Sequence, residues 1–295
     1  MSQVVLQTVS QKLPILPAKV RALLQALEEP ARYTTAELAS MVAACGNLEA
    51  VLVNMLNSGF FRTRRKVRSA QDAFLLIGFN ATRSVILGAV LKGLFPPREI
   101  VRNFDRELFL RHCIGTALAS EMLAEKAGLS SELNRYRMST YGFTHDIGTL
   151  ALDYCLPVTL SRIYAHARSA GVTILQAERH ILGELNHGII GELVCRIWQL
   201  PADITNVVAY HHAPRQAKSD RTAVTVLYVG DNISWNYYEK LLSDQGLRYP
   251  MEKSVLAELG LSQADAVQIE EALPQQVDQA MRLLTLEAVD FSMLA

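Results

Sequence analysis

Apolar residues spaced three and four positions apart recur along this 295-residue chain, and this spacing limits its possible folds more than any other feature. The run after Thr34 opens with Glu37 three residues later, the spacing of a helix-capping box. Other runs begin at helix-capping residues too: Asn47, Ser69 and Asn80. No segment alternates apolar and polar residues over six or more positions. We therefore predict an all-α fold.

A break at residues 95–103 (FPPREIVRN) divides the expected helices, because its two prolines cannot continue a helix. Upstream, residues 10–97 are predicted to form a bundle of about five short helices. Downstream, residues 98–242 form a second helical part, whose longest amphipathic helix comes first. Residues 243–295 are predicted to add an extension of three short helices. The helices expected in the second part span roughly 104–129, 132–147, 157–170, 173–184, 186–199, 201–212 and 221–241.

Composition argues against several classes of protein. The 29 basic and 29 acidic residues cancel, so charge indicates neither a nucleic acid nor a membrane partner. The longest clean apolar stretch, residues 85–91, is far shorter than the roughly 20 residues of a membrane span. The first residues lack the pattern of a signal peptide, and four widely spaced cysteines suit neither a disulfide framework nor a zinc ribbon. We expect a cytoplasmic protein.

Five of the seven histidines, together with two aspartates, stand where neighbouring helices of a bundle can bring them to one level of its core. They are His112 on the long helix, His145 and Asp146 at the end of the next, His187 after the capping Asn186, His211 and His212 at a later helix end, and Asp231 within the last helix.

Imidazole nitrogens and carboxylate oxygens together suit divalent ions such as iron, manganese, zinc or nickel. Four residues are available as ligands for one ion: His112, His145, Asp146 and Asp231. Asp146 can bridge to a second ion bound by His187 and by His211 or His212. Two ions roughly 3.5–4 Å apart activate water and stabilise a phosphoryl oxygen. A single histidine at a helix end is more often a cation favoured by the helix dipole or a satisfied core residue than a metal ligand, so only the whole set indicates a metal site.

The order of these motifs resembles the HDOD domain family, a branch of the HD superfamily of metal-dependent phosphohydrolases. The resemblance covers about residues 13–240 and runs through LPILPAKVRALLQAL, NLEAVLVNMLNSGFF, SAQDAFLLIGFNATRSVIL, HDIG, HGIIG, IWQLP and AYHHAP. It implies an N-terminal HDOD subdomain followed by an HD-like subdomain with the metal site. It also implies that one or two divalent ions are the only cofactors, and that His145 and Asp146 are catalytic in any active form.

The chain departs from the related HD-GYP enzymes, which cleave cyclic di-GMP. Those enzymes place a lysine after HDIG, where this chain has Thr149, and a Gly-Tyr-Pro triplet after HH, where it has APRQAKSD. Leu108 replaces the acidic ligand of a three-metal site, and Cys45-Gly46 replaces the family's Asp-Pro. The resemblance therefore favours a regulatory protein that acts through protein–protein interaction over an active enzyme. The alternative is a metal-dependent phosphohydrolase acting on a nucleotide or cyclic nucleotide.

Five basic side chains crowd into a short stretch between two expected helices: Arg62, Arg64, Arg65, Lys66 and Arg68. Such a stretch can bind a phosphate-rich ligand or an acidic partner, although a solvated loop is the simpler interpretation. No interleaved aromatic residues or recognition-helix signal support base readout, so nucleic acid is not expected. We expect a signalling protein as the partner, with a nucleotide as the alternative ligand.

Overall fold

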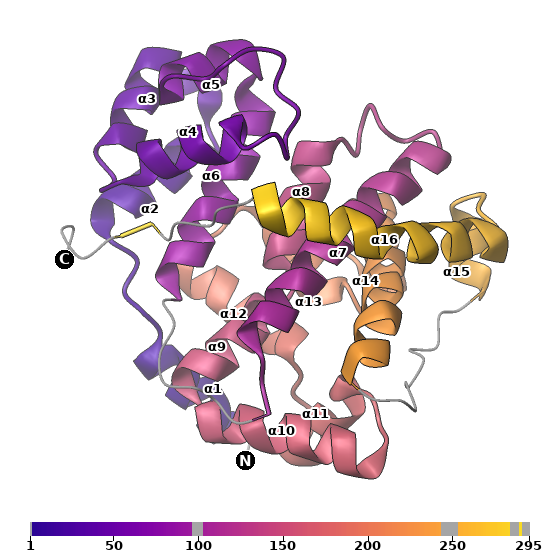
Figure 1. The fold of residues 1–295 in the computed structure, drawn as a ribbon. Helices are drawn as coiled ribbons and strands as arrows, with labels where there is room; N and C mark the ends of the chain where they lie inside the picture. Colours follow the sequence, from indigo (N-terminus) through magenta and orange to yellow (C-terminus); the bar gives the residue numbers. More distant parts are fainter. Residues whose placement is uncertain (1, 96–102, 243–252, 284–288, 291–295) are drawn as a thin grey trace.

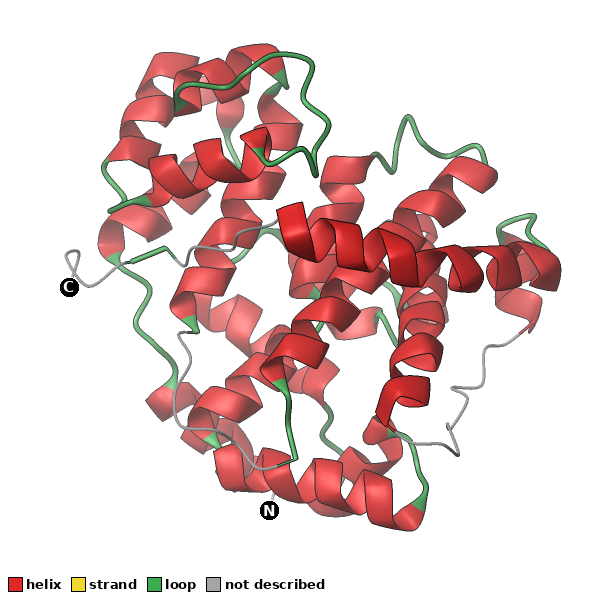
Figure 2. Ribbon diagram, in the orientation of Figure 1, coloured by secondary structure: helices red, strands yellow, loops and turns green. Residues whose placement is uncertain are grey.

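The computed structural model describes residues 2–95, 103–242, 253–283 and 289–290, and every regular element within them is a helix (Figures 1 and 2). This confirms the predicted all-α fold. The helices gather into two bundles, with a long C-terminal helix lying across the second (Figure 1). Among these residues, no single helix has both the length and the apolar composition to cross a membrane.

The N-terminal bundle comprises α2 (Ala18–Ala26), α3 (Thr35–Ala43), α4 (Leu48–Asn57), α5 (Ala70–Leu76) and α6 (Phe79–Leu94), with a short 3₁₀ helix, Pro30–Arg32. The predicted capping box is present at α3: Thr34 Oγ1 accepts from Glu37 N–H at 3.2 Å, and the Glu37 carboxylate accepts from Thr34 N–H at 2.7 Å. Helix α6 begins one residue earlier than Asn80, because Gly78 takes a left-handed backbone conformation (φ 87°) that turns the chain into it.

The second bundle, here called the histidine-bearing bundle, comprises eight α-helices in its described residues. They are α7 (Arg106–Lys126), α8 (Arg135–Thr144), α9 (Ile147–Cys155), α10 (Pro157–Ala170), α11 (Ile174–Leu182), α12 (His187–Trp198), α13 (Ala202–Tyr210) and α14 (Arg221–Leu242), with a 3₁₀ helix at Pro214–Gln216. Helix α7 packs most extensively against α8 and α14. Helix α14, at 22 residues, is slightly longer than α7, so the prediction that the first helix is the longest was wrong.

Two helices were missed from the sequence. Helix α1 (Ser2–Lys12) packs against α9 and α12 of the histidine-bearing bundle, far from α2 (Figure 1). Its Val5 and Val9 are buried, and Trp198 Nε1–H donates to the Pro14 carbonyl oxygen at 3.0 Å just beyond its end. Helix α9 was the other: it occupies the stretch between the helices predicted over 132–147 and 157–170, and α8, which corresponds to the first of these, ends at Thr144.

The tail differs from the expected three short helices. In its described part it forms one short helix, α15 (Lys253–Glu258), and one long helix, α16 (Gln263–Leu283), which packs against α7 and α14. The predicted boundary at 97–98 falls within residues 96–102, outside the described residues, and that at 242–243 borders another such stretch. These boundaries stay predictions.

A polar contact joins the two bundles. Arg83 on α6 donates to the Glu28 carboxylate at 2.7 Å and to the Asp203 carboxylate on α13 at 3.0 Å. Tyr141 on α8 donates its hydroxyl to the same aspartate at 3.3 Å. The N-terminal bundle is thereby tied to α8 and α13, the two helices that end immediately before His145 and His211.

Candidate metal centre

Seven polar side chains meet inside the histidine-bearing bundle, and they are the seven candidate ligands. They come from five places in the bundle: His112 from α7, His145 and Asp146 from the α8–α9 junction, His187 from the start of α12, His211 and His212 from the end of α13, and Asp231 from α14. Neighbouring side chains approach one another to 2.7–3.7 Å, measured between two imidazole nitrogens or between an imidazole nitrogen and a carboxylate oxygen. The structure thus brings together residues up to 119 positions apart, from 112 to 231.

The first group lies around His112. Its Nε2 is 3.1 Å from Asp231 Oδ1 and 3.3 Å from His145 Nε2. His145 Nε2 is in turn 3.5 Å from Asp231 Oδ1 and 3.5 Å from Asp146 Oδ2. These four residues are the ligands expected for one ion.

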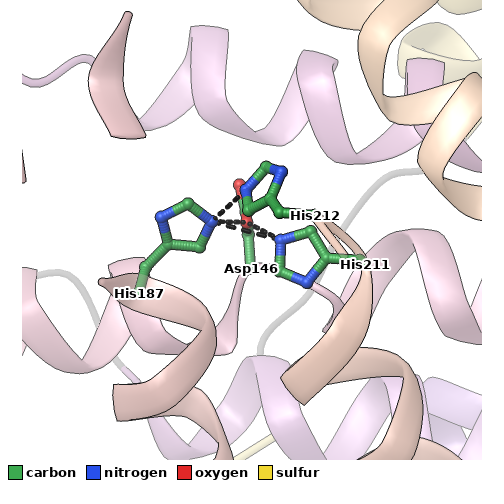
Figure 3. Close-up of side chains that lie close together, drawn as sticks. All are labelled: Asp146, His187, His211 and His212. Atoms are coloured by element: carbon green, nitrogen blue, oxygen red, sulfur yellow. Dashed lines mark hydrogen bonds and ion pairs between the residues drawn. The ribbon is translucent and has the colours of Figure 1, made fainter. Parts of the chain in front are cut away.

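The second group lies at the other carboxylate oxygen of Asp146, and Figure 3 shows its members. Asp146 Oδ1 is 3.1 Å from His187 Nε2 and 3.4 Å from His211 Nε2. His212 Nε2 approaches His187 Nε2 at 2.7 Å. The ligand atoms of Asp146 and these three histidines all lie within 4.8 Å of one another, close enough to surround one cation. Asp146 therefore presents one carboxylate oxygen to each group.

The position of Asp146 beside His187 depends on a close crossing of α9 and α12. A Cβ on Gly148 would lie 1.9 Å from the His187 carbonyl oxygen, and one on Gly191 would lie 3.2 Å from the Gly148 backbone nitrogen. Only glycine allows the two backbones to approach this closely. The glycines of HDIG and HGIIG are therefore packing residues that set the separation of two ligands.

A hydrogen bond at the other ring nitrogen orients each of three histidines. His145 Nδ1 lies 2.8 Å from the Gly142 carbonyl oxygen, and His211 Nδ1 lies 2.8 Å from the Val208 carbonyl oxygen. A carbonyl oxygen only accepts, so Nδ1 carries the proton and Nε2 is left with a free lone pair. His112 Nδ1 contacts Ser234 Oγ at 3.0 Å, and that hydroxyl donates to the His112 carbonyl oxygen.

Glu178 is a site residue that the sequence analysis missed. Its carboxylate lies 2.8 Å from His187 Nδ1 and accepts from the His187 backbone N–H at 3.1 Å, with none of its surface exposed. A signal was present: Glu178 falls in the apolar stripe of α11, between Ile174 and Leu182 at helical spacing. An acidic residue in such a stripe needs a buried partner.

Burial disfavours the charged form of every ionisable side chain in the cluster. Burial and the neighbouring groups together decide whether each pKa lies above or below its ordinary value. Burial acts to raise the pKa of Asp146 and Asp231, but the adjacent imidazoles lower both below their ordinary value. Burial acts to lower the pKa of His187, but Glu178 and Asp146 raise it. At His212, burial dominates and the neighbouring imidazoles add to it, so its pKa falls well below the usual range. The carboxylates are thus ionised at neutral pH, as cation ligands must be.

Two carboxylate oxygens have no hydrogen-bond donor among the described residues: Asp146 Oδ1 and Asp231 Oδ1, both buried. A buried, ionised oxygen without a donor is strongly destabilising unless another positive group compensates it. A divalent cation in each group would supply that charge. The donor set, five imidazoles and two carboxylates, therefore fits iron, manganese, zinc or nickel.

The cluster is almost closed to solvent. Six of its seven side chains are at most 5% exposed, and His212 is the exception at 16%. Trp235 covers the His112 ring, with the centroids 4.3 Å apart. Thr149, at the position where active relatives are expected to carry lysine, is buried and uncharged.

The basic stretch lies elsewhere, on the loop between α4 and α5. All five of its side chains are exposed: Arg62, Arg64, Arg65, Lys66 and Arg68. It does not take part in the metal centre.

Comparison with known proteins identifies a family. The HDOD domain profile matches residues 13–214 of this chain. An uncharacterized protein of Treponema pallidum is 22% identical over 222 residues, which cover 70% of this chain and 39% of that protein. The chain thus spans about two fifths of the length of this curated relative.

Three crystal structures share the fold over most of the chain. An HDOD domain protein of unknown function from Geobacter sulfurreducens superposes with a TM-score of 0.69 at 20% identity, covering 97% of this chain and 99% of its own. A candidate phosphohydrolase from Shewanella amazonensis gives 0.68 at 21% identity, covering 94% and 96%. A protein assigned to signal transduction from Marinobacter aquaeolei gives 0.69 at 19% identity, covering 92% of this chain and 59% of its own.

Proposed function

The chain belongs to the HDOD domain family, and we propose that it is a signalling protein that acts by binding another protein and does not turn over a substrate. The observation that carries this proposal is the burial of the histidine–aspartate cluster. A phosphohydrolase must bring a phosphoryl group to its ligand atoms, yet six of the seven side chains are at most 5% exposed. A closed centre is suited to holding helices together.

The residues that would hold a cation connect the second bundle across its full width. His112 and Asp231 bring in α7 and α14, while His187 and His211 bring in the start of α12 and the end of α13. Asp146, at the start of α9, stands between the two groups. A bound divalent cation would neutralise the carboxylates and, where a phosphoryl group could reach it, polarise that group. The chain's own residues orient the ligands and keep water out.

A second candidate function is phosphohydrolysis of a nucleotide or cyclic nucleotide. One observation favours it: the two oxygens of Asp146 face two separate ligand groups, which is the arrangement of a two-metal hydrolase. In that case His212, the most exposed member of the cluster, lies where a substrate would enter. Uncharged, buried Thr149 weighs against it, because no lysine stands there to bind a phosphate.

Metal analysis combined with an activity assay separates the two functions. Protein purified without chelators is expected to contain about one to two equivalents of a divalent metal per chain. It should hydrolyse neither cyclic dinucleotides nor a panel of nucleotides when manganese or iron is added. In Asp146→Asn the metal should be lost and the melting temperature should fall.

The matched control is Asp153→Asn. Asp153 is also a buried aspartate on α9, but it pairs with Arg106 outside the cluster. This variant should lose stability and keep its metal. Hydrolysis that is present in the wild type and in Asp153→Asn, and absent in Asp146→Asn, would establish the phosphohydrolase instead.

A further inference from the structure

A hollow of about 570 Å³ lies away from the candidate metal centre, at the junction of the two bundles. We call it the basic hollow. Its walls come from the α4–α5 loop, the end of α5 and the first turn of α8, and they include Arg62, Arg64, Arg65, Leu75, Leu76 and Tyr136.

The described residues do not neutralise the positive charge of the basic hollow. Among the described residues, no carboxylate comes within ion-pair distance of Arg64 or Arg65, and both side chains are exposed. Glu121 lies near enough to Arg62 to be influenced by its charge, but that carboxylate is paired with Arg135 at 2.7 Å. The hollow therefore presents net positive charge to a ligand.

One wall of the basic hollow is apolar. Leu75 is 65% exposed and Leu76 is 42% exposed, and the two are consecutive at the end of α5. Exposed leucines are unremarkable singly, but a pair beside three arginines forms a surface that is both cationic and apolar. A simple inorganic anion would contact only the arginines of this surface and leave the leucines exposed.

We propose that the basic hollow binds an acidic segment of a partner protein that carries apolar side chains, its carboxylates on Arg64 and Arg65 and its apolar side chains on Leu75 and Leu76. This inference rests on the proposed signalling role and gives the chemistry of the partner. Charge complementarity selects an acidic ligand, and the leucines select a peptide over a bare phosphate.

Two observations argue against nucleic acid as the ligand. Base stacking along a strand needs several free aromatic faces, whereas Tyr136 is the single aromatic ring among the residues that line the hollow, and one of its faces is already stacked on Phe61, with centroids 5.6 Å apart and an interplanar angle of 2°. The chain as a whole has no net charge, so it lacks the general attraction for a polyanion.

The place of the basic hollow connects it to the metal centre. Tyr136 lies in the first turn of α8, and the same helix ends at Thr144, immediately before His145 and Asp146. This ten-residue helix is about 15 Å long. A segment docked in the hollow would thus contact the helix that positions two of the candidate metal ligands.

The test is a binding titration with a fluorescently labelled synthetic peptide of glutamates and leucines, followed by anisotropy on the full chain. Arg64→Glu/Arg65→Glu should weaken binding about tenfold or more, a change of about 1.4 kcal/mol or more. The matched control is Lys66→Glu/Arg68→Glu, which makes the same charge change on the same loop outside the hollow. It should weaken binding less than about threefold, because only long-range attraction is lost.

Two further probes separate the apolar and ionic contributions. A peptide with serine in place of each leucine should bind several-fold more weakly, as should Leu75→Ser with the original peptide. Equal weakening by the two double variants, equal affinity for the serine peptide, or tighter binding of single-stranded DNA would each overturn the proposal. Helical content and metal content, measured on every variant, show that the fold is intact. A failed titration with unchanged metal content and no hydrolysis would reject the hollow and leave the signalling role standing.

Discussion

The two bundles of this protein have cores of different chemistry. Among the described residues of the N-terminal bundle, the buried polar side chains are Thr82 and Ser84, and all others in its core are apolar. The histidine-bearing bundle buries a set of charged or ionisable groups: His112, His145, Asp146, Asp153, Glu178, His187, His211 and Asp231. The first bundle can fold by removing apolar surface from water alone. The second must also balance charge in its interior.

This difference indicates that the two bundles have different roles. A core of leucines and valines has no group that responds to an ion, so the N-terminal bundle is suited to be a stable platform for the basic hollow. The histidine-bearing bundle gathers its helices around carboxylates that need a cation, so its stability should depend on metal supply. Experiments that compare the same change in both cores test this directly.

The largest effect is expected for leucine truncation in the two cores. Leu52 on α4 and Leu152 on α9 are both fully buried, so Leu52→Ala and Leu152→Ala should each lower the free energy of unfolding by about 2–5 kcal/mol. The Leu52→Ala penalty should be the same with manganese and with a chelator. The Leu152→Ala penalty should change with metal, because α9 carries Asp146. Denaturant titrations under both conditions provide the measurement. Equal metal dependence of the two stability penalties would contradict different roles for the two bundles.

The second effect concerns two glycines within helices. Gly148→Ala forces α9 away from α12 and should lower the free energy of unfolding by about 3 kcal/mol and release metal. Gly88→Ala on α6 places its methyl 3.7 Å from a Phe143 ring carbon, an ordinary contact. It should be neutral or stabilise the protein by about 0.5–1 kcal/mol, because alanine favours helix over glycine. Thermal melts with metal analysis check both, and retained metal in Gly148→Ala would show that the crossing does not position the ligands.

A third effect should weaken metal binding at the candidate centre without unfolding the protein. Glu178→Gln keeps the volume beside His187 but removes the charge, and it should weaken metal binding about 10–100-fold. The control is Glu192→Gln, a partly exposed residue of α12 paired with Arg196, which should bind metal normally. Competition with a coloured chelator gives the affinities. Unchanged affinity in Glu178→Gln would mean that the charge of Glu178 does not support metal binding through His187.

The smallest effect is expected at the contact between the bundles. Burial acts to raise the pKa of Asp203, but its hydrogen bonds with Arg83 and the arginine's charge lower it below the ordinary value. A carboxyl with a lowered pKa in the folded state stabilises above its unfolded pKa of about 3.9, and this contribution is lost as pH falls through the folded value. The wild type should exceed Asp203→Asn in stability by up to about 1 kcal/mol at pH 6. This gap should narrow as pH falls below about 4 and close once pH is below the folded value. A gap of unchanged size in denaturation at pH 6 and at pH 3 would exclude the ionic explanation.

Local sequence signals predicted much of the fold, and their failures have local causes. The α3 capping box was readable because its partners are three residues apart, and the chain makes both of its hydrogen bonds. Helix α9 was missed because only His145 and Asp146 separate it from α8, so no proline or loop marked a new start between two helical stretches. Helix α1 was missed because its apolar face is completed by α9 and α12, residues well over 100 positions away.

For the centre, the residue types and their order along the chain were enough to select the candidate ligands and the metals that suit them, since ligand chemistry belongs to the side chain itself. Only the packed helices decided that Asp146 turns one oxygen to each group, that Glu178 supports His187, and that the cluster is closed to solvent. The physical reason is the distance along the sequence over which each interaction acts. Caps and helical periodicity act within a few residues, whereas the meeting of His112 with His145 and Asp231 depends on how whole helices pack.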